Sequence, residues 1–134
     1  MISLSEIQET LDFCTSDEER FSYIIELGKQ LSPYPENKKD EEHKIYGCSS
    51  SIWFTYNMDD ANKCHFLFFS DALIVRGLLA IVTAIFDEKS PDEIRNTDTD
   101  YIFKNLGLNS TLSNQRQVGL SSVIKRIKEL KFDK

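Results

Sequence analysis

The sequence predicts an α+β fold in which several helices pack against a small antiparallel sheet of about three strands. Two helical segments come first, a β region follows, and further helical segments complete the chain. Helices and strands that are segregated along a chain in this way are typical of α+β domains. The length of 134 residues suits one domain with its own core, so we expect a single domain over residues 1–134.

The first two helices are predicted from their start signals. Ser3 and Ser16 are each followed three residues later by Glu, which is the pattern of a capping box. Apolar residues then recur at helical spacing, and the first stripe includes Cys14, which predicts a buried structural thiol. We expect the second helix to end at Ser32, because the residue before a proline is disfavoured in helical conformation. Residues 36–44 are polar and predict a surface loop.

The β region is predicted to form a hairpin. Over residues 52–57, Ile, Phe and Tyr alternate with Trp, Thr and Asn, a pattern and composition that favour a strand. Residues 57–62 resemble a turn, and residues 64–69 provide the partner strand. Cys64 belongs to this apolar strand, so we expect it in the core. A short third strand near residues 45–48 is compatible with the pattern.

The C-terminal half is predicted to be helical. Ser70 or Asp71 is expected to cap a long apolar helix that continues to about Phe86. Its apolar residues cover most of the helix circumference, which predicts the central buried helix of the domain. Three later helices are expected, starting near Pro91, Asp100 and Ser113.

The composition excludes several classes of function. A net charge of -6 argues against a nucleic-acid-binding surface, which needs clustered Lys and Arg. No apolar run approaches the roughly 20 residues of a membrane span, and the N-terminus lacks a secretory signal, so we expect a cytoplasmic protein. An acidic protein should prefer a partner with a basic docking surface. One locally basic stretch is interpreted as the solvated face of the last helix: Lys125, Arg126, Lys128 and Lys131.

The three cysteines, Cys14, Cys48 and Cys64, are interpreted as free thiols. Their odd number and wide spacing give no disulfide framework. They form no C-x-x-C pair, and His43 and His65 do not complete a zinc-ligand spacing with them. The chain also lacks a glycine-rich phosphate loop. We therefore expect neither a bound metal nor a cofactor.

Cys48 differs from the other two thiols because it lies where a polar loop meets a strand. Gly47 before it permits a backbone conformation that other residues avoid, and the three serines after it are poor core material. A thiol at the tip of a turn is accessible, and its thiolate can attack a sulfur–sulfur bond and keep the outer sulfur. Two other interpretations stay open on this evidence: an incidental exposed thiol, and a thiol hydrolase that uses Cys48 with His43 or His65.

Four segments, in the right order along most of the chain, resemble the SufE-type family of sulfur-transfer proteins. Residues 45–53 (IYGCSSSIW) resemble the family signature G-C-Q-S-Q-V-W. Residues 23–28 (YIIELG) resemble its second helix. Residues 69–80 (FSDALIVRGLLA) resemble its S-D-A-x-I-V-x-G-L-x-A helix start, and residues 113–120 (SNQRQVGL) its S-x-x-R-x-x-G-L segment.

This resemblance implies a curved antiparallel sheet flanked by helices, and a sulfur-acceptor role for Cys48. In the family, the matching cysteine takes sulfane sulfur from the persulfide of a pyridoxal-phosphate cysteine desulfurase, stimulates that enzyme, and supplies a scaffold for iron–sulfur cluster assembly. The carrier itself binds neither the pyridoxal cofactor nor a metal. Ser49 and Ser51 replace two glutamines of the family pattern, which is expected to alter thiol exposure or docking. The main alternative is a non-catalytic adaptor that activates a desulfurase by binding alone.

Gly47, Asp71 and Arg116 match positions of the family motifs and are expected to support Cys48. The resemblance implies that Asp71 and Arg116 either position the Cys48 loop or dock the desulfurase. The alternatives are a helix N-cap for Asp71 and a surface salt bridge for Arg116. The expected partners are a cysteine desulfurase and an iron–sulfur scaffold, without nucleic acid or membrane, and the protein itself is expected to be a monomer or a homodimer.

Overall fold

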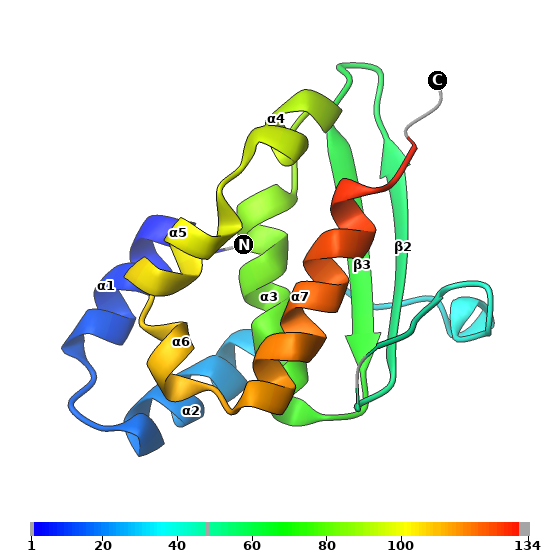
Figure 1. Ribbon diagram of the computed structural model, residues 1–134. Helices are drawn as coiled ribbons and strands as arrows, with labels where there is room; N and C mark the ends of the chain where they lie inside the picture. Colours follow the sequence, from blue (N-terminus) through cyan, green and yellow to red (C-terminus); the bar gives the residue numbers. More distant parts are fainter. Residues whose placement is uncertain (1, 48, 132–134) are drawn as a thin grey trace.

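The computed structural model shows an α+β architecture, as predicted, with a layer of helices against a three-stranded sheet (Figure 1). It describes residues 2–47 and 49–131. No helix in these two ranges is both long and apolar enough to cross a bilayer. The elements in chain order are α1 (Leu4–Phe13), α2 (Asp17–Gly28), the 3-10 turn η1 (Glu36–Lys38), β1 (Lys44–Ile45), β2 (Ile52–Met58), β3 (Cys64–Ser70), α3 (Leu73–Phe86), α4 (Pro91–Asn96), α5 (Thr99–Asn105), α6 (Leu108–Thr111) and α7 (Asn114–Lys128).

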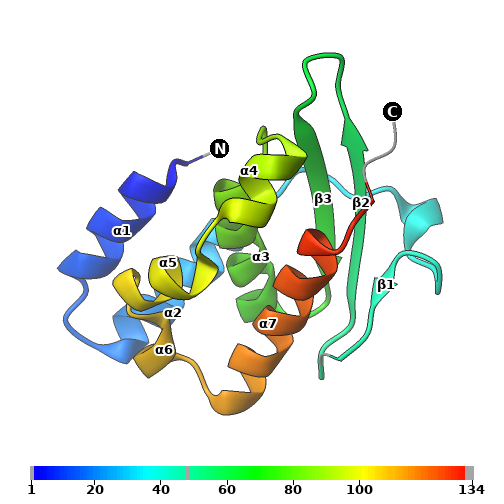
Figure 2. The same cartoon turned by 45° about the horizontal axis from the view of Figure 1, so that its top comes forward.

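The sheet has the order β1-β2-β3, and both pairs of strands are antiparallel. Figure 2 shows β1 at the edge, beside β2. The first pair closes with Ile45 opposite Ile52, so residues 46–51 form a loop whose two ends are held together by the sheet. Alternate residues are buried along the whole of β3, as the period-2 pattern predicts, but in β2 only Ile52 and Phe54 are buried and Tyr56 is exposed. The Phe54 and Phe68 rings stack with centroids 6.0 Å apart beneath the helices.

Helix α3 is the buried centre of the helical layer, as expected from its apolar circumference. It packs against β3 on one side and against α2 on the other. The approach to α2 is unusually close at Gly77. A Cβ atom added there would overlap the carbonyl oxygen of Ile24 and lie 2.6 Å from its carbonyl carbon. The two helices therefore meet backbone to backbone, which only glycine permits at this position.

Serine caps start four of the helices at the predicted places. The side chains of Ser3, Ser16, Ser90 and Ser113 each accept a hydrogen bond from the backbone N–H three residues later. At α4 the capping box is reciprocal, because Glu93 also accepts from the Ser90 N–H at 3.0 Å. Local chemistry alone is sufficient to place these helix starts.

Two helix boundaries differ from the prediction. Helix α2 ends at Gly28 and not at Ser32. The residues after Gly28 form hydrogen bonds to the residue three positions earlier, as in a 3-10 turn; the Gln30 N–H, for example, donates to the Leu27 carbonyl at 3.0 Å. Helix α3 begins after Ala72, so neither Ser70 nor Asp71 is its cap. The Ser70 hydroxyl instead accepts from the Ala72 N–H at 3.3 Å in the turn that precedes the helix.

The two described cysteines have different surroundings. Cys64 is fully buried in β3, which confirms its predicted core position. Burial raises the pKa of its thiol above the ordinary value. Cys14 is only half-buried, so the prediction of a buried thiol is wrong. The helix ends at Phe13, and the extended backbone of Cys14 removes it from the apolar stripe; its Sγ lies 3.4 Å from the Thr10 carbonyl oxygen.

The loop between α2 and β1 contacts the Phe69 ring of β3 through Lys39 and through Tyr34, whose ring centroid lies 6.3 Å from that of Phe69. Arg76 of α3 lies against the same ring. Lys39 Nζ lies 3.5 Å from the centroid of the Phe69 ring, and the Arg76 guanidinium carbon lies 4.8 Å from it. The Tyr34 hydroxyl donates to the Lys38 carbonyl at 3.0 Å. Burial, together with the charge of Asp40, raises the pKa of Tyr34 to about 12. The predicted surface loop is therefore an anchored segment.

The β2–β3 turn is organised by Asp59. Its carboxylate accepts from the N–H groups of Ala61 and Lys63, at 2.9 and 3.0 Å, and lies 2.7 Å from Nε2 of His65. Nδ1 of His65 lies 3.9 Å from the carboxylate of Asp87, at the end of α3. The hydrogen bond to Asp59 raises the pKa of His65 above 6.5, and the same bond lowers the pKa of Asp59 below 3.8.

This pairing predicts a pH-dependent contribution to stability. The raised pKa of His65 stabilises the fold below pH 6.5 and loses that effect as pH rises through the folded value. The lowered pKa of Asp59 stabilises it above pH 3.8 and loses that effect as pH falls. We expect His65→Gln to reduce the free energy of unfolding more at about pH 5.5 than at about pH 8.5 in urea titrations. An equal reduction at both values would contradict this pairing.

Candidate functional site

The loop that joins β1 to β2 is the candidate site, because it contains the predicted sulfur acceptor. Cys48 itself lies outside the described residues. Its neighbours are described on both sides. Gly47 and Ser49 are exposed, and Ser50 is half-buried. The structure therefore describes the residues on both sides of the predicted acceptor.

Gly47 has the positive φ that the sequence suggested, at +95°. A Cβ atom at this position would lie 2.8 Å from the Oγ of Ser122 on α7. The Ser122 hydroxyl is 3.4 Å from the Gly47 carbonyl oxygen and 3.1 Å from that of Val118, so its one proton can be donated toward either. Sequence reasoning missed Ser122, which joins the loop to α7 from 75 residues away.

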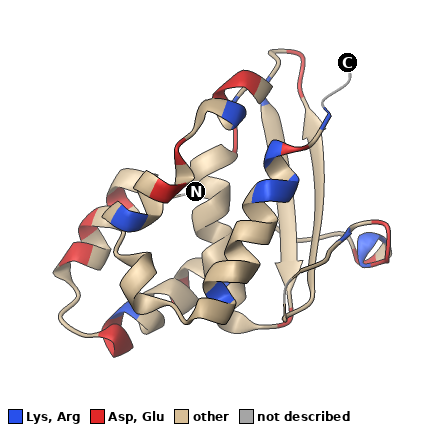
Figure 3. Cartoon of the chain, viewed as in Figure 1, with Lys and Arg blue, Asp and Glu red and all other residues tan. Residues whose placement is uncertain are grey.

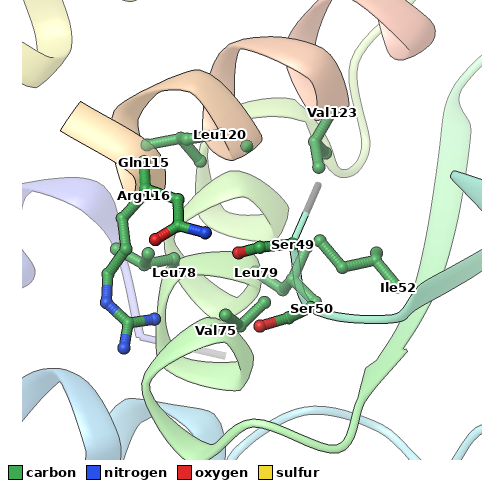
Figure 4. Close-up of a pocket in the computed structure, with 11 residues that line it drawn as sticks. Ser49, Ser50, Ile52, Val75, Leu78, Leu79, Gln115, Arg116, Leu120 and Val123 are labelled. Atoms are coloured by element: carbon green, nitrogen blue, oxygen red, sulfur yellow. The ribbon is translucent and has the colours of Figure 1, made fainter. Parts of the chain in front are cut away.

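A small pocket lies between the loop, α3 and α7 (Figure 4). Its accessible volume is about 30 Å³, enough for one or two atoms of the size of a water molecule. In Figure 4 the hydroxyls of Ser49 and Ser50 point toward the same space as the Gln115 amide, and the Arg116 side chain runs along its rim. The apolar lining comes from Ile52 on β2, from Val75, Leu78 and Leu79 on α3, and from Leu120 and Val123 on α7.

Arg116 and Asp71 occupy different places relative to this pocket. Arg116 lines it and is half-buried, and its backbone N–H donates to the Ser113 Oγ at 3.3 Å. Within residues 2–47 and 49–131, no carboxylate forms a salt bridge with its guanidinium, so the salt-bridge alternative lacks support there. Asp71 is exposed in the turn before α3 and does not line the pocket. The helix-cap alternative for Asp71 is wrong, because Ala72 holds that position.

His65 is remote from a thiol in this loop, whereas His43 immediately precedes β1. His65 pairs with Asn57, five positions along the strand from the Ile52–Ser70 pair, which is about 16 Å at strand spacing. Nδ1 of His43 lies 2.7 Å from the Asp40 carboxylate in the preceding turn. Asp40, Glu42 and His43 bring potential ligand atoms within 4.8 Å of one another, but the bonds of His43 to Asp40 already account for this turn.

Comparison with known proteins identifies the family. The family model described as "SufE: Fe-S metabolism associated domain" matches residues 5–131. An uncharacterized SufE-like protein of Rhizobium meliloti (strain 1021) is 45% identical over 131 residues, which cover 96% of this chain and 94% of that protein. Another from Rhizobium etli is 41% identical over 132 residues, covering 96% of this chain and 89% of that protein.

A solved structure supports the fold independently. The solution structure of a hypothetical protein from Thermus thermophilus has a TM-score of 0.74, covering 96% of this chain and 93% of that one, at 17% identity. A likeness at this identity concerns the fold alone. The family model covers nearly the whole chain, and both relatives cover almost the full length. The chain therefore belongs to the SufE family, whose domain is associated with iron–sulfur metabolism.

Proposed function

We propose that this protein is a sulfur carrier, in which Cys48 takes the outer sulfur of a persulfide on a pyridoxal-phosphate cysteine desulfurase and delivers it to a scaffold for iron–sulfur cluster assembly. The observation that carries the proposal is the loop between β1 and β2, whose ends are held by the Ile45–Ile52 pair and from which Ser49 and Ser50 line a small pocket. Family membership supports the same function. Sulfur exchange between thiols suits a reducing compartment, so we place the protein in the cytoplasm.

The transfer needs only thiolate chemistry from this chain. The Cys48 thiolate attacks the outer sulfur of the donor persulfide, and a new sulfur–sulfur bond forms as the donor's own sulfur–sulfur bond breaks. The electron pair of the broken bond leaves with the desulfurase cysteine as a thiolate, so no external oxidant or reductant is consumed. Removal of the persulfide frees the desulfurase for another turnover, which accounts for stimulation. Passage to a scaffold thiolate repeats the same step.

The surroundings of the loop suit a persulfide for two reasons. The pocket between side chains such as Leu78 and Val123 has room for only one or two atoms of the size of a water molecule, so a larger soluble reductant cannot enter it. The cation of Arg116 at the rim favours an anionic sulfur over a neutral thiol. We assign Arg116 this electrostatic role and assign the exposed Asp71 to docking of the desulfurase. Gly47 supplies the backbone turn into the loop.

Intact-mass spectrometry tests the carrier directly. We expect the protein, after incubation with a cysteine desulfurase and cysteine, to gain the mass of one or more sulfur atoms. A thiol reductant should reverse the gain, and peptide mapping should locate it at Cys48. Prior alkylation of Cys48 should prevent it. No gain with an accelerated desulfurase would indicate the adaptor alternative, and no gain with no acceleration would contradict both functions for that desulfurase.

A further inference from the structure

A basic groove lies beside the candidate loop, between the segment of residues 44–46 and α7. It occupies about 370 Å³ and is formed chiefly by Lys44, Tyr46, Ser122, Lys125, Arg126 and Glu129. It shares Ser122 and Lys125 with a second hollow along the outer surface of α7. Sequence segments that are about 80 residues apart thus form one continuous surface next to Gly47.

The groove concentrates positive charge on an acidic protein. It has three cations against the single carboxylate of Glu129, whereas the whole chain has a net charge of -6. Among the described residues, no carboxylate forms a salt bridge with Lys44, Lys125 or Arg126. In Figure 3 the C-terminal half of α7 carries blue bands, with one red band at its end, while red segments lie on α1 and at the starts of α2 and α4. The groove is therefore the place where this molecule attracts anionic groups.

Aromatic rings hold two of these cations in position. Lys44 Nζ lies 5.7 Å from the centroids of both Tyr46 and Trp53, and the Arg126 guanidinium lies 5.4 Å from that of Phe54. A cation placed in this way loses less side-chain entropy when it binds an anion than a free surface lysine does. The cationic face is therefore partly organised before any partner arrives.

Two exposed side chains provide anchors for a protein partner. Tyr46 is 62% exposed and Val118 is 60% exposed, and they lie on either side of Ser122. The Tyr46 hydroxyl donates to Glu41, which orients the ring. Exposed tyrosines beside cations and apolar contacts are characteristic of the centres of protein interfaces. The combination fits a protein surface better than a small anion.

We propose that this groove, the Lys44–Lys125 groove, docks an acidic surface of the cysteine desulfurase, an inference that rests on the proposed function. The groove begins at Tyr46, two residues before Cys48, so its occupant is placed next to the acceptor loop. A sulfur donor must lie next to the acceptor loop, because the transfer needs direct contact between the two sulfur atoms. The acidic remainder of the carrier repels an acidic partner, so only the orientation that presents the groove is attractive. The basic stretch of α7 is then a docking face, and not only the solvated face that its composition suggested. The proposal also replaces the expectation of a basic docking surface on the partner, because the charge of the groove is opposite to the net charge of the chain.

Matched charge reversals test this proposal. Lys44→Glu with Lys125→Glu changes the groove, and Lys29→Glu with Lys104→Glu makes the same change of net charge at exposed sites on α2's end and α5. We expect the groove pair to raise the Kd for a purified cysteine desulfurase about tenfold at low salt, and the control pair to raise it less than about twofold. Added salt should raise the Kd of the wild type and reduce the difference in Kd between the groove pair and the control pair. Lys44→Ala with Lys125→Ala provides a milder version, and circular dichroism checks that each variant is folded.

The outcomes separate this proposal from the proposed function. Equal effects of the groove and control pairs, no effect of the groove pair, or no binding by the wild type would overturn the docking proposal. Sulfur loading of Cys48 is followed by mass in the same samples. If the protein gains sulfur but the groove substitutions do not change the Kd, the carrier function is supported and the docking proposal is wrong. If the groove substitutions raise the Kd but the wild type gains no sulfur, the docking proposal is supported and the carrier function is wrong.

Discussion

Cys48→Ser is expected to eliminate sulfur acceptance completely while the protein remains folded. The reaction requires a thiolate at neutral pH, and a serine hydroxyl is neither ionised there nor able to form a transferable bond to sulfane sulfur. Oxygen for sulfur is a small change in volume at a position between Gly47 and Ser49, both of which are exposed. Loss of function without loss of stability is therefore the predicted result.

The measurement compares sulfur gain by intact mass with alanine production by the desulfurase. Cys14→Ser is the matched control, because Cys14 is a half-buried thiol at the end of α1, remote in sequence from the loop. We expect the control to gain sulfur and stimulate the enzyme as the wild type does. Undiminished stimulation by Cys48→Ser would identify the adaptor, and undiminished sulfur gain by Cys48→Ser would place the acceptor on another thiol.

Gly77→Ala is expected to lower the free energy of unfolding by at least about 3 kcal/mol. Helix propensity alone predicts the opposite sign, since alanine is favoured over glycine inside a helix by about 1 kcal/mol. Packing decides the outcome, because the added methyl group would overlap the Ile24 carbonyl oxygen. That obstacle is backbone in the middle of α2, so no change of side-chain rotamer can remove it. The two helices would have to separate along a contact that is central to the core.

Urea unfolding followed by circular dichroism measures this effect. Leu73→Ala is the control in the same helix, since Leu73 is 59% exposed at the start of α3, and we expect it to cost less than about 1 kcal/mol. Gly28→Ala should be intermediate, because its added Cβ would lie 2.9 Å from both the Arg76 Cβ and the Gly77 nitrogen. A Gly77→Ala protein as stable as the wild type would show that α2 and α3 are not in close contact.

The parts of the fold that depend on local chemistry could be predicted from the sequence. Serine caps and alternating apolar residues act within a few positions, and they located the hairpin and four of the helix starts. The start of α3 could not be found in this way. Nε of Arg76 donates to the Ser70 carbonyl at 2.6 Å, which holds the chain in a turn that no local pattern announces. Helix α6 is four residues long, too short to show a period.

The candidate site also has parts that could be predicted from the local sequence and parts that could not. The residue types around Cys48 and the motif positions of Gly47 and Arg116 were visible in the sequence. The pocket was not, because Leu78 and Val123 belong to apolar stripes that look the same whether or not they leave a space. Ser122 gave no signal, since its partner Gly47 lies 75 residues away. Lys44 joins the cations of α7 only through the fold.

The pairing of Ile45 with Ile52 sets a limit on the range of the carrier. Cys48 is the third residue after Ile45, and three residues of extended chain span about 10 Å. A chain of this length that is attached at both ends to paired strands cannot carry the backbone at position 48 farther than about 10 Å from Ile45 while the pair is intact. In the proposed carrier, sulfur is therefore expected to be exchanged close to the ends of β1 and β2. The proposed donor and scaffold would both need this short stretch of surface, so we expect them to bind there in turn and not at the same time.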